Sequence, residues 1–189
     1  MTDYLKDFRK SPTWGKNWHV MGSPTGDLSK DNAELTDKGL VLWCRNGQGG
    51  GVMLDRPKRY GLWEVRMRIE PGSTNPSTKV CLLLWPDGGG WPPEIDFNES
   101  GDRTRSNQTL HYDSDNKMLH TSYPVDQTKW HTYGARVTSE RVVYRCDDVF
   151  KGMVTNFAPG ILWNVHLRTE TNGYDDETKL QVRWVRISD

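Results

Sequence analysis

Residues 63–70 alternate strictly between apolar and charged side chains, and this alternation constrains the fold more than any other feature of the sequence. Trp, Val, Met and Ile stand at every second position, with glutamates and arginines between them. Successive side chains of an extended chain point to opposite faces, so the pattern predicts a β-strand with one face in a core. An amphipathic helix would instead place apolar residues three or four positions apart.

Other short apolar runs, separated by Gly, Pro, Asn and Asp, predict further strands. Residues 79–85 are apolar on both faces, which is typical of a central strand that is covered on both sides. Helical periodicity is nearly absent, and we find no internal repeat. We therefore expect one all-β sandwich domain over residues 1–189. The further predicted strands are residues 39–44, the hairpin pair 136–138 and 141–146, and residues 161–169 and 180–187.

The charge balance excludes some classes of partner. Lys plus Arg number 25 and Asp plus Glu number 25, so the formal net charge is zero. A nucleic-acid-binding protein or a polybasic membrane anchor usually carries a basic surplus, so we expect neither partner. The first residues lack a secretory leader pattern, and no segment has the length of a transmembrane helix. We expect an extracellular or virion-associated protein whose leader was removed or which leaves the cell by lysis.

Cysteine and glycine positions exclude two kinds of site. Cys44, Cys81 and Cys146 are few and widely spaced, which predicts buried thiols rather than a metal cluster; one disulfide among them is the alternative. The glycine-rich residues 47–51 lack a following helical pattern and a closing Lys-Ser or Lys-Thr pair. They therefore predict a tight turn with close backbone approach, and not a phosphate-binding loop.

Three acids, Glu94, Asp96 and Glu99, fall within six residues of one predicted strand. On an ideal strand Glu94 and Asp96 share a face, Ile95 and Phe97 occupy the other, and Glu99 points away from the other acids. One extra residue, a β-bulge at residues 97–98, returns Glu99 to their face. We therefore expect a bulged strand that carries one acidic row.

The spacing of this row suits glycoside hydrolysis with retention. The Cα atoms of Glu94 and Glu99 would lie roughly 13 Å apart, and inward-leaning side chains would leave a gap of about 5 Å. One carboxylate would attack while the other protonates the leaving oxygen, and Asp96 would hydrogen-bond the nucleophile. The alternatives are an ordinary solvated strand face and a cation site.

The segment Glu94-Ile95-Asp96-Phe97-Asn98-Glu99 resembles the bulged active-site signature Glu-x-Asp-x-x-Glu of glycoside hydrolase family 16, which includes laminarinases and lichenases. Other motifs of that family are matched in order along most of the chain. They are residues 60–69 (YGLWEVRMRI), 84–86 (LWP) with the glycine loop and 91–92 (WP) that follow, 110–112 (LHY), 130–133 (WHTY) and 182–186 (VRWVR).

This resemblance implies a concanavalin-like jelly roll of two curved antiparallel sheets, with a substrate cleft across one face and no cofactor. It implies that Glu94 is the nucleophile, Asp96 its helper and Glu99 the acid/base. Nine tryptophans are present, and most are expected in the core, although Trp rings also stack on sugars. The resemblance places Trp91 beside the cleft as a sugar platform and Trp85 half in the core and half in the cleft floor.

Other aromatic positions are less constrained by the resemblance. His111 is expected to face the cleft, with a structural histidine as the alternative. Trp163 is expected towards the cleft, and Trp130 and Trp184 in the core.

The sequence departs from the family pattern at three points. The chain is short, so trimmed cleft loops leave its substrate range open. Arg183 stands where family members often carry an Asp that binds a structural calcium, so we expect no metal site there. Residues 164–170 are more charged than their usual counterpart.

The function that we expect is a retaining endo-acting hydrolase of a β-linked polysaccharide, with β-1,3- or mixed β-1,3/1,4-glucan as the foremost substrate. Two alternatives use the same fold. One is a non-catalytic carbohydrate-binding module, and the other is a bacteriophage virion-surface or tail protein with virion assembly partners. An intact acid row favours the enzyme, because a lectin gains nothing from crowded, mutually repelling carboxylates.

Overall fold

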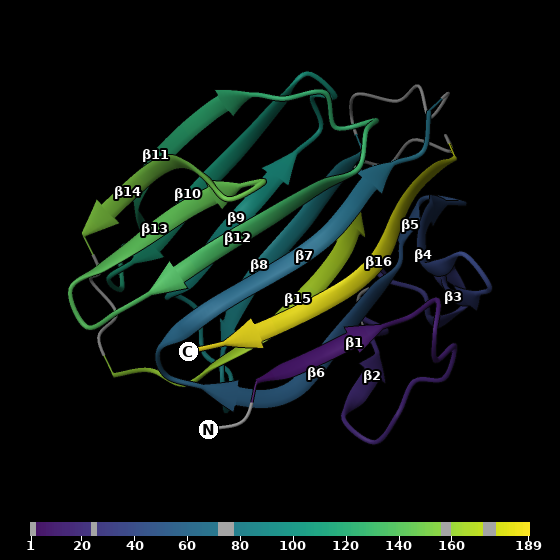
Figure 1. Cartoon of the computed structure of the whole chain (residues 1–189), viewed down its shortest axis with the longest axis horizontal. Helices are drawn as coiled ribbons and strands as arrows, with labels where there is room; N and C mark the ends of the chain where they lie inside the picture. The colour runs from purple at the N-terminus through teal and green to yellow at the C-terminus, as the bar shows by residue number, and fades with distance from the viewer. Residues whose placement is uncertain (1–2, 24–25, 72–77, 156–159, 172–176) are drawn as a thin grey trace.

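The computed structural model describes residues 3–23, 26–71, 78–155, 160–171 and 177–189. Within these ranges the regular elements are β-strands, apart from one turn of 3₁₀-helix at Lys30–Asn32. The strands form two antiparallel sheets that pack face to face (Figure 1). The all-β sandwich that the alternating pattern predicts is therefore confirmed.

The sheet nearer the viewer in Figure 1 is nine-stranded. Its main path runs β14 (Val149–Thr155), β13 (Arg141–Cys146), β12 (His131–Val137), β7 (Gly61–Ile69), β16 (Thr178–Ser188), β4 (Gly39–Arg45) and β3 (Ala33–Thr36). Two short strands join it at the side: β1 (Tyr4–Asp7) pairs with β16, and β5 (Gln48–Gly49) pairs with β4.

The second sheet is seven-stranded and lies behind the first in Figure 1. The predicted central strand, β8, stands at its middle, which confirms the reading of residues 79–85. The order is β11 (Lys117–Pro124), β10 (Arg105–Tyr112), β9 (Glu94–Ser100), β8 (Lys79–Pro86), β15 (Trp163–Glu170), β6 (Gly51–Lys58) and β2 (Trp18–Val20).

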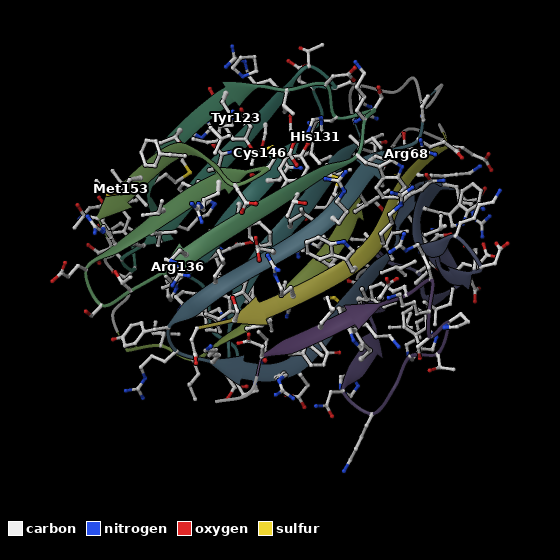
Figure 2. The ribbon with its side chains drawn as sticks, viewed as in Figure 1. Arg68, Tyr123, His131, Arg136, Cys146 and Met153 are labelled. Atoms are coloured by element: carbon white, nitrogen blue, oxygen red, sulfur yellow. The ribbon has the colours of Figure 1, made fainter. Side chains whose placement is uncertain are left out.

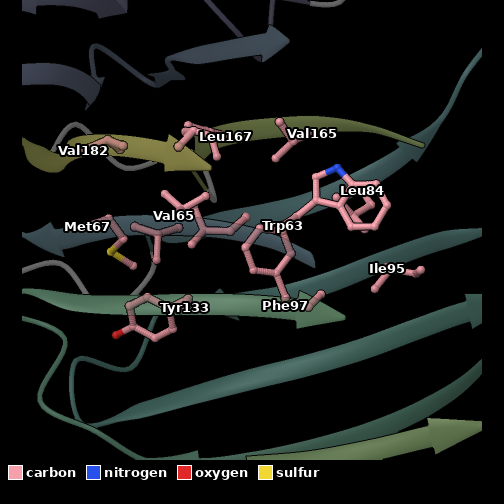
Figure 3. Close-up of a cluster of buried hydrophobic side chains, with 14 of the residues drawn as sticks. Trp63, Val65, Met67, Leu84, Ile95, Phe97, Tyr133, Val165, Leu167 and Val182 are labelled. Carbon is pink, nitrogen blue, oxygen red and sulfur yellow. The ribbon is translucent and has the colours of Figure 1, made fainter. Parts of the chain in front are cut away.

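The hydrophobic core fills the space between the sheets. The apolar residues of β7, from Trp63 to Ile69, are 0% exposed, so the alternation predicts their burial correctly. They meet apolar side chains of the seven-stranded sheet, including Leu84, Ile95 and Val165 (Figure 3). The opposite face of β7 is charged, and its one buried acid, Glu64, lies 2.6 Å from Nε of Arg186.

The glycine-rich residues 47–51 form a turn against crowded backbone, as predicted. A Cβ atom on Gly49 would lie 1.8 Å from the carbonyl oxygen of Thr169, and one on Gly50 would lie 2.0 Å from that of Asn32. Only glycine fits so close an approach. The turn is shorter than expected, because residues 48–49 already belong to β5 and Gly51 begins β6.

Three tryptophan predictions are wrong. Trp163 is 0% exposed and lies in the core, because β15 alternates and places Trp163, Val165 and Leu167 on its inner face. Trp130 and Trp184 are partly exposed, and arginine side chains stack on both rings. A guanidinium group interacts favourably with an aromatic face, so these tryptophans are stabilised at partly exposed positions.

All three cysteines are buried free thiols, so the prediction of thiols is confirmed and its disulfide alternative is not. No helix in the described part of the chain is long and apolar enough to cross a membrane.

Candidate active site

The three acids of β9 lie on the outer face of the seven-stranded sheet, which we call the acid face. Ile95 and Phe97 point the other way and are buried in the core. The register places Asp96 opposite Leu83 and Glu99 opposite Cys81 on β8, while Glu94 pairs with His111 on β10. Glu94, Asp96 and Glu99 therefore form one row along the strand.

A β-bulge produces this row, at the position that the sequence predicts. Leu82 pairs with Asn98 and Leu83 pairs with Asp96, so Phe97 is an extra residue in β9. Asn98 is fully buried behind the bulge. Its amide nitrogen donates to Gln127 Oε1 at 2.9 Å, and its amide oxygen accepts from Ser106 Oγ at 2.6 Å. These bonds fix the irregular backbone that turns Glu99 towards the other acids.

Glu94 is a buried carboxylate held from three sides. The indole N–H of Trp91 donates to its Oε2 at 2.7 Å, a guanidinium nitrogen of Arg168 lies 3.7 Å from Oε1, and Asp96 forms a side-chain hydrogen bond with it. Burial raises the pKa of Glu94, while Arg168 and the indole act against this rise. Glu94 is thus fixed in position, with its negative charge supported by neighbours.

The side chains of Asp96 and His111 are in direct contact. Nε2 of His111 lies 3.2 Å from Asp96 Oδ2, and Nδ1 lies 2.8 Å from Asn116 Oδ1. Burial, together with the carboxylates of Glu94 and Glu99, raises the pKa of Asp96 to about 8 although His111 opposes the rise. The hydrogen bond to Asp96 raises the pKa of His111 to about 9. At neutral pH, a protonated Asp96 can donate to Glu94 while the imidazolium donates to Asp96 and Asn116.

Glu99 is the most open of the three acids, with 26% of its side chain exposed. Nζ of Lys79 lies 3.0 Å from Glu99 Oε1, and this hydrogen bond raises the pKa of Lys79. The carboxylate also lies near Cys81 and Glu170. Glu94 and Glu99 therefore occupy different environments, one closed and one open.

Strand β15 adds a row of polar residues that are not among the predicted site residues. Asn164, His166, Arg168 and Glu170 alternate with its core residues and so face the same side as the acids. Nε of Arg168 lies 2.7 Å from Glu170 Oε1, so this guanidinium joins Glu170 to Glu94. The unusual charge of residues 164–170 is the signal that could have identified this row.

His166, like Asn164, is a buried member of that row. Its ring stacks on Trp85 with centroids 6.0 Å apart and planes at 19°. Neither ring nitrogen has a hydrogen-bond partner among the described residues, and burial lowers the pKa of His166 to about 4. His166 is therefore neutral near pH 7.

Three of the four predicted aromatic site residues lie on the acid face or beside the acids, and one lies in the core. Trp91 is 48% exposed, and its ring centroid lies 5.7 Å from that of His111, so both stand beside the acids. Trp85 is partly buried on the acid face of β8. Trp163 lies in the core instead and is not part of the site.

A cation site was an alternative for these acids. Ligand atoms of Glu94, Asp96 and His111 lie within 4.8 Å of one another, which is close enough for an ion. These groups already contact one another, however, with His111 Nε2 3.2 Å from Asp96 Oδ2. The arrangement suits proton sharing between carboxyl groups better than metal binding.

Comparisons with known proteins address the family and the fold of the chain. Residues 22–160 match the family model described as Glycosyl hydrolases family 16. No curated protein matches the chain. The catalytic domain of an endo-1,3-beta-glucanase (laminarinase) from Thermotoga petrophila RKU-1 superposes with a TM-score of 0.83 at 16% identity, covering 98% of this chain and 96% of that one.

Two further solved structures are similar. The laminarinase catalytic domain from Thermotoga maritima MSB8 has a TM-score of 0.83 at 14% identity, with 98% of this chain and 97% of that one covered. A prokaryotic β-1,3-1,4-glucanase (lichenase) derived from a mouse hindgut metagenome has a TM-score of 0.80 at 17% identity, with 100% and 99% covered. At such identities the likeness establishes the fold, which is the sandwich that the sequence motifs imply.

Proposed function

The chain belongs to glycosyl hydrolase family 16, and on this basis we propose that it cleaves a β-linked polysaccharide internally, with retention of anomeric configuration. The observation that supports this function best is the acid row of β9. Glu94 is fixed by Trp91 and Asp96, and Glu99 stands open on the same face. A closed carboxylate beside an open one matches the different duties of nucleophile and acid/base.

We propose a β-1,3- or mixed β-1,3/1,4-glucan as the substrate. Two of the similar structures are described as laminarinases and one as a lichenase. The formal net charge of zero suits a neutral polymer. The exposed ring of Trp91, next to Glu94, offers a flat surface on which a pyranose can stack.

In the first step, a carboxylate oxygen of Glu94 attacks the anomeric carbon while Glu99 gives its proton to the departing glycosidic oxygen. The glycosidic bond breaks, and a covalent glycosyl ester forms on Glu94. The Trp91 indole and protonated Asp96 hold Glu94 in line, and Arg168 supports its charge before attack.

In the second step, Glu99 takes a proton from water, and the oxygen of that water attacks the anomeric carbon. The ester bond to Glu94 breaks, the carboxylate returns, and the product keeps the configuration of the substrate. Each step uses only carboxyl groups and water.

The first experiment compares the release of reducing sugar from laminarin, lichenan, agarose, carrageenan and xyloglucan by the native protein and by Glu94→Gln. We expect release from a β-glucan by the native protein and almost none by the variant. Glu140→Gln, at an exposed acid in the turn between β12 and β13, is the matched control and should keep full activity.

Azide tests the nucleophile directly. In Glu94→Ala, azide can enter the vacated space and attack an activated aryl β-glycoside, giving an α-glycosyl azide. Equal turnover by the native protein and Glu94→Gln would refute the assignment of Glu94. Glycan binding by folded protein without any product would favour the non-catalytic binding module.

We further propose that the protein works outside cells or on a virion surface, because that is where polysaccharides of this class are met. Analytical ultracentrifugation addresses the virion alternative. A ring or trimer would support virion assembly partners, and a strict monomer would count against them.

A further inference from the structure

The outer face of the nine-stranded sheet carries a groove of about 590 Å³, on the opposite side of the sandwich from the acid row. Strands β3, β4, β7 and β16 contribute most of its lining, and Trp130 and other residues outside these strands complete it. The lining holds five cations and three acids, so positive charge is in excess. These residues are Arg9, Lys38, Arg68, Lys179 and Arg183, and Glu34, Asp37 and Glu70. Its volume falls within the range of ordinary ligand sites.

Trp130, which lines this groove, lies close to arginines from two strands. The guanidinium carbon of Arg183 lies 4.0 Å from the Trp130 ring centroid, and that of Arg68 lies 5.0 Å from it. Figure 2 labels Arg68 near the end of β7, on the face turned to the viewer. Two guanidinium groups are thus gathered around one indole ring.

A β-bulge directs Arg183 to this position. Val182 pairs with Met67 and Trp184 pairs with Arg66, so Arg183 is an extra residue in β16. Its carbonyl oxygen accepts a hydrogen bond from the backbone of Phe8 at 2.9 Å. Bulges commonly re-aim a side chain, and here the side chain leans over Trp130.

These two arginines differ from their neighbours in having no carboxylate partner among the described residues. Arg9 pairs with Asp7 at 2.7 Å, and Lys179 pairs with Glu70 at 2.9 Å. Arg68 donates only to the amide oxygen of Gln181, at 2.7 Å. The guanidinium of Arg183 lies over the Trp130 ring.

The cations around Arg183 repel one another. Partial burial lowers the pKa of Arg183, and the nearby charges of Arg9, Arg66 and Arg68 lower it further, with Asp7 acting against them. A like-charged cluster of this kind is relieved by a bound anion. Arginine forks match the oxygens of carboxylate, sulfate and phosphate groups.

We propose that this groove binds an anionic saccharide, whose acidic group accepts hydrogen bonds from Arg68 and Arg183 while its sugar ring packs beside Trp130. The site would hold an acidic glycan on the face opposite Glu94 and Glu99, without cleaving it. It is therefore a second glycan site that is independent of the proposed hydrolysis.

Affinity electrophoresis and titration calorimetry test the site with three polymers: polygalacturonate for carboxylate, dextran sulfate for sulfate, and dextran as the neutral probe. We expect the native protein to bind at least one acidic polymer and not dextran. The double variant Arg68→Gln/Arg183→Gln should bind that polymer at least about tenfold more weakly. Arg183→Lys should recover only part of the affinity, because an ammonium lacks the guanidinium fork.

Arg105→Gln/Arg141→Gln is the matched control, because it removes the same charge from exposed arginines outside the groove. We expect the control to bind like the native protein and Glu94→Gln to do so as well. Circular dichroism establishes that each variant is folded. Equal weakening by both double variants would reveal only non-specific charge attraction and overturn the proposal, as would failure of the native protein to bind either acidic polymer.

Discussion

At the residue scale, Asp96 is the acid of the β9 row whose ionisation most depends on folding. It is 2% exposed and contacts both Glu94 and His111. A carboxyl group at such a place keeps its proton to higher pH, and this lets it donate to the nucleophile rather than repel it. The protonation state of Asp96 therefore affects both the stability of the protein and the ability of Glu94 to act as the nucleophile.

This link predicts how stability changes with pH. The pKa of Asp96 rises to about 8 and that of His111 to about 9 in the folded protein, so the folded state binds more protons than the unfolded state. The free energy of unfolding must then fall as pH rises through these values. Asp96→Asn removes one titrating group and the partner that raises the pKa of the other, so its stability should vary less with pH.

Urea denaturation at pH 5, 7 and 9 measures the effect. Relative to the native protein, Asp96→Asn should gain on the order of 1 to 2 kcal/mol between pH 5 and pH 9. Asp115→Asn, at an exposed position, should follow the native curve. Parallel curves for Asp96→Asn and the native protein would contradict the raised pKa values.

Arg168 predicts a kinetic effect at the same scale. Among its neighbours, Arg168 acts most strongly against the burial that raises the pKa of Glu94. Glu94 must be ionised to attack, so Arg168→Gln should move the acid limb of the kcat/KM profile to higher pH. Arg168→Lys should largely restore the native limb, since it keeps the charge. An unmoved acid limb in a folded Arg168→Gln protein would show that Arg168 has no electrostatic role.

Residue types alone predict part of this site. The spacing of Glu94, Asp96 and Glu99 implies one acidic row, and the resemblance to a known signature adds Trp91 and His111. Arg168 and His166 escape prediction because their positions on the acid face depend on which strands become neighbours. The pairing of β15 with β8 arises from residues far apart in sequence, and no local pattern encodes it.

At the element scale, the bulge of β9 is what makes the row of acids. Asn98 is 0% exposed and anchors the bulge through Gln127 and Ser106. Asn98→Ala removes the buried hydrogen bonds that Gln127 and Ser106 make with the Asn98 side chain. This loss should lower the free energy of unfolding by about 1–3 kcal/mol. Because Glu99 follows directly, kcat should fall as well.

A double-mutant cycle with Ser106→Ala separates this anchor from general damage. If the hydrogen bond between Ser106 and Asn98 matters, the two substitutions should cost less together than the sum of their separate effects. Asn107→Ala, at a partly exposed position of the same β10 strand, is the matched control and should change stability by less than about 0.5 kcal/mol. Strict additivity of Asn98→Ala and Ser106→Ala would argue against an anchored bulge.

The strands themselves were largely predictable, but the faces of some were not. In β7 the alternation is strict, and the burial of Trp63 follows from it. In β15 the apolar and polar residues also alternate. The prediction for Trp163 nevertheless relied on the tendency of tryptophans to bind sugars, and not on its alternation with Val165. An alternating pattern defines which residues share a face, but only the packing of the sheets decides which face is inside.

At the scale of the whole molecule, the two ends of the chain hold the sandwich together. The last two strands lie inside the sheets: β15 stands between β8 and β6, and β16 stands between β7 and β4. The N-terminal strands split between the sheets, with β1 on β16 and β2 on β6 (Figure 1). These connections join distant parts of the sequence, and hydrophobic periodicity alone could not predict them.

Phe8 lies between β1 and β2, where the first strands pass from one sheet to the other. It is 0% exposed, and its ring packs edge-on against Trp18 with centroids 5.2 Å apart. The indole N–H of Trp18 donates to the hydroxyl of Tyr4 at 2.9 Å, which ties the two short strands to each other. The N-terminal segment is therefore part of the core and not an appended arm.

This arrangement predicts that Phe8→Ala lowers the free energy of unfolding by about 3–5 kcal/mol, as expected for a large core aromatic. Because Phe8 joins both sheets, denaturation should remain a single transition when it is followed by tryptophan fluorescence and by far-ultraviolet circular dichroism. Leu5→Ala is the matched control: Leu5 lies in the adjoining strand but is 63% exposed, so its loss should change stability by less than about 0.5 kcal/mol. Similar small effects of both substitutions would mean that the N-terminal segment packs only loosely on a sandwich that is stable without it.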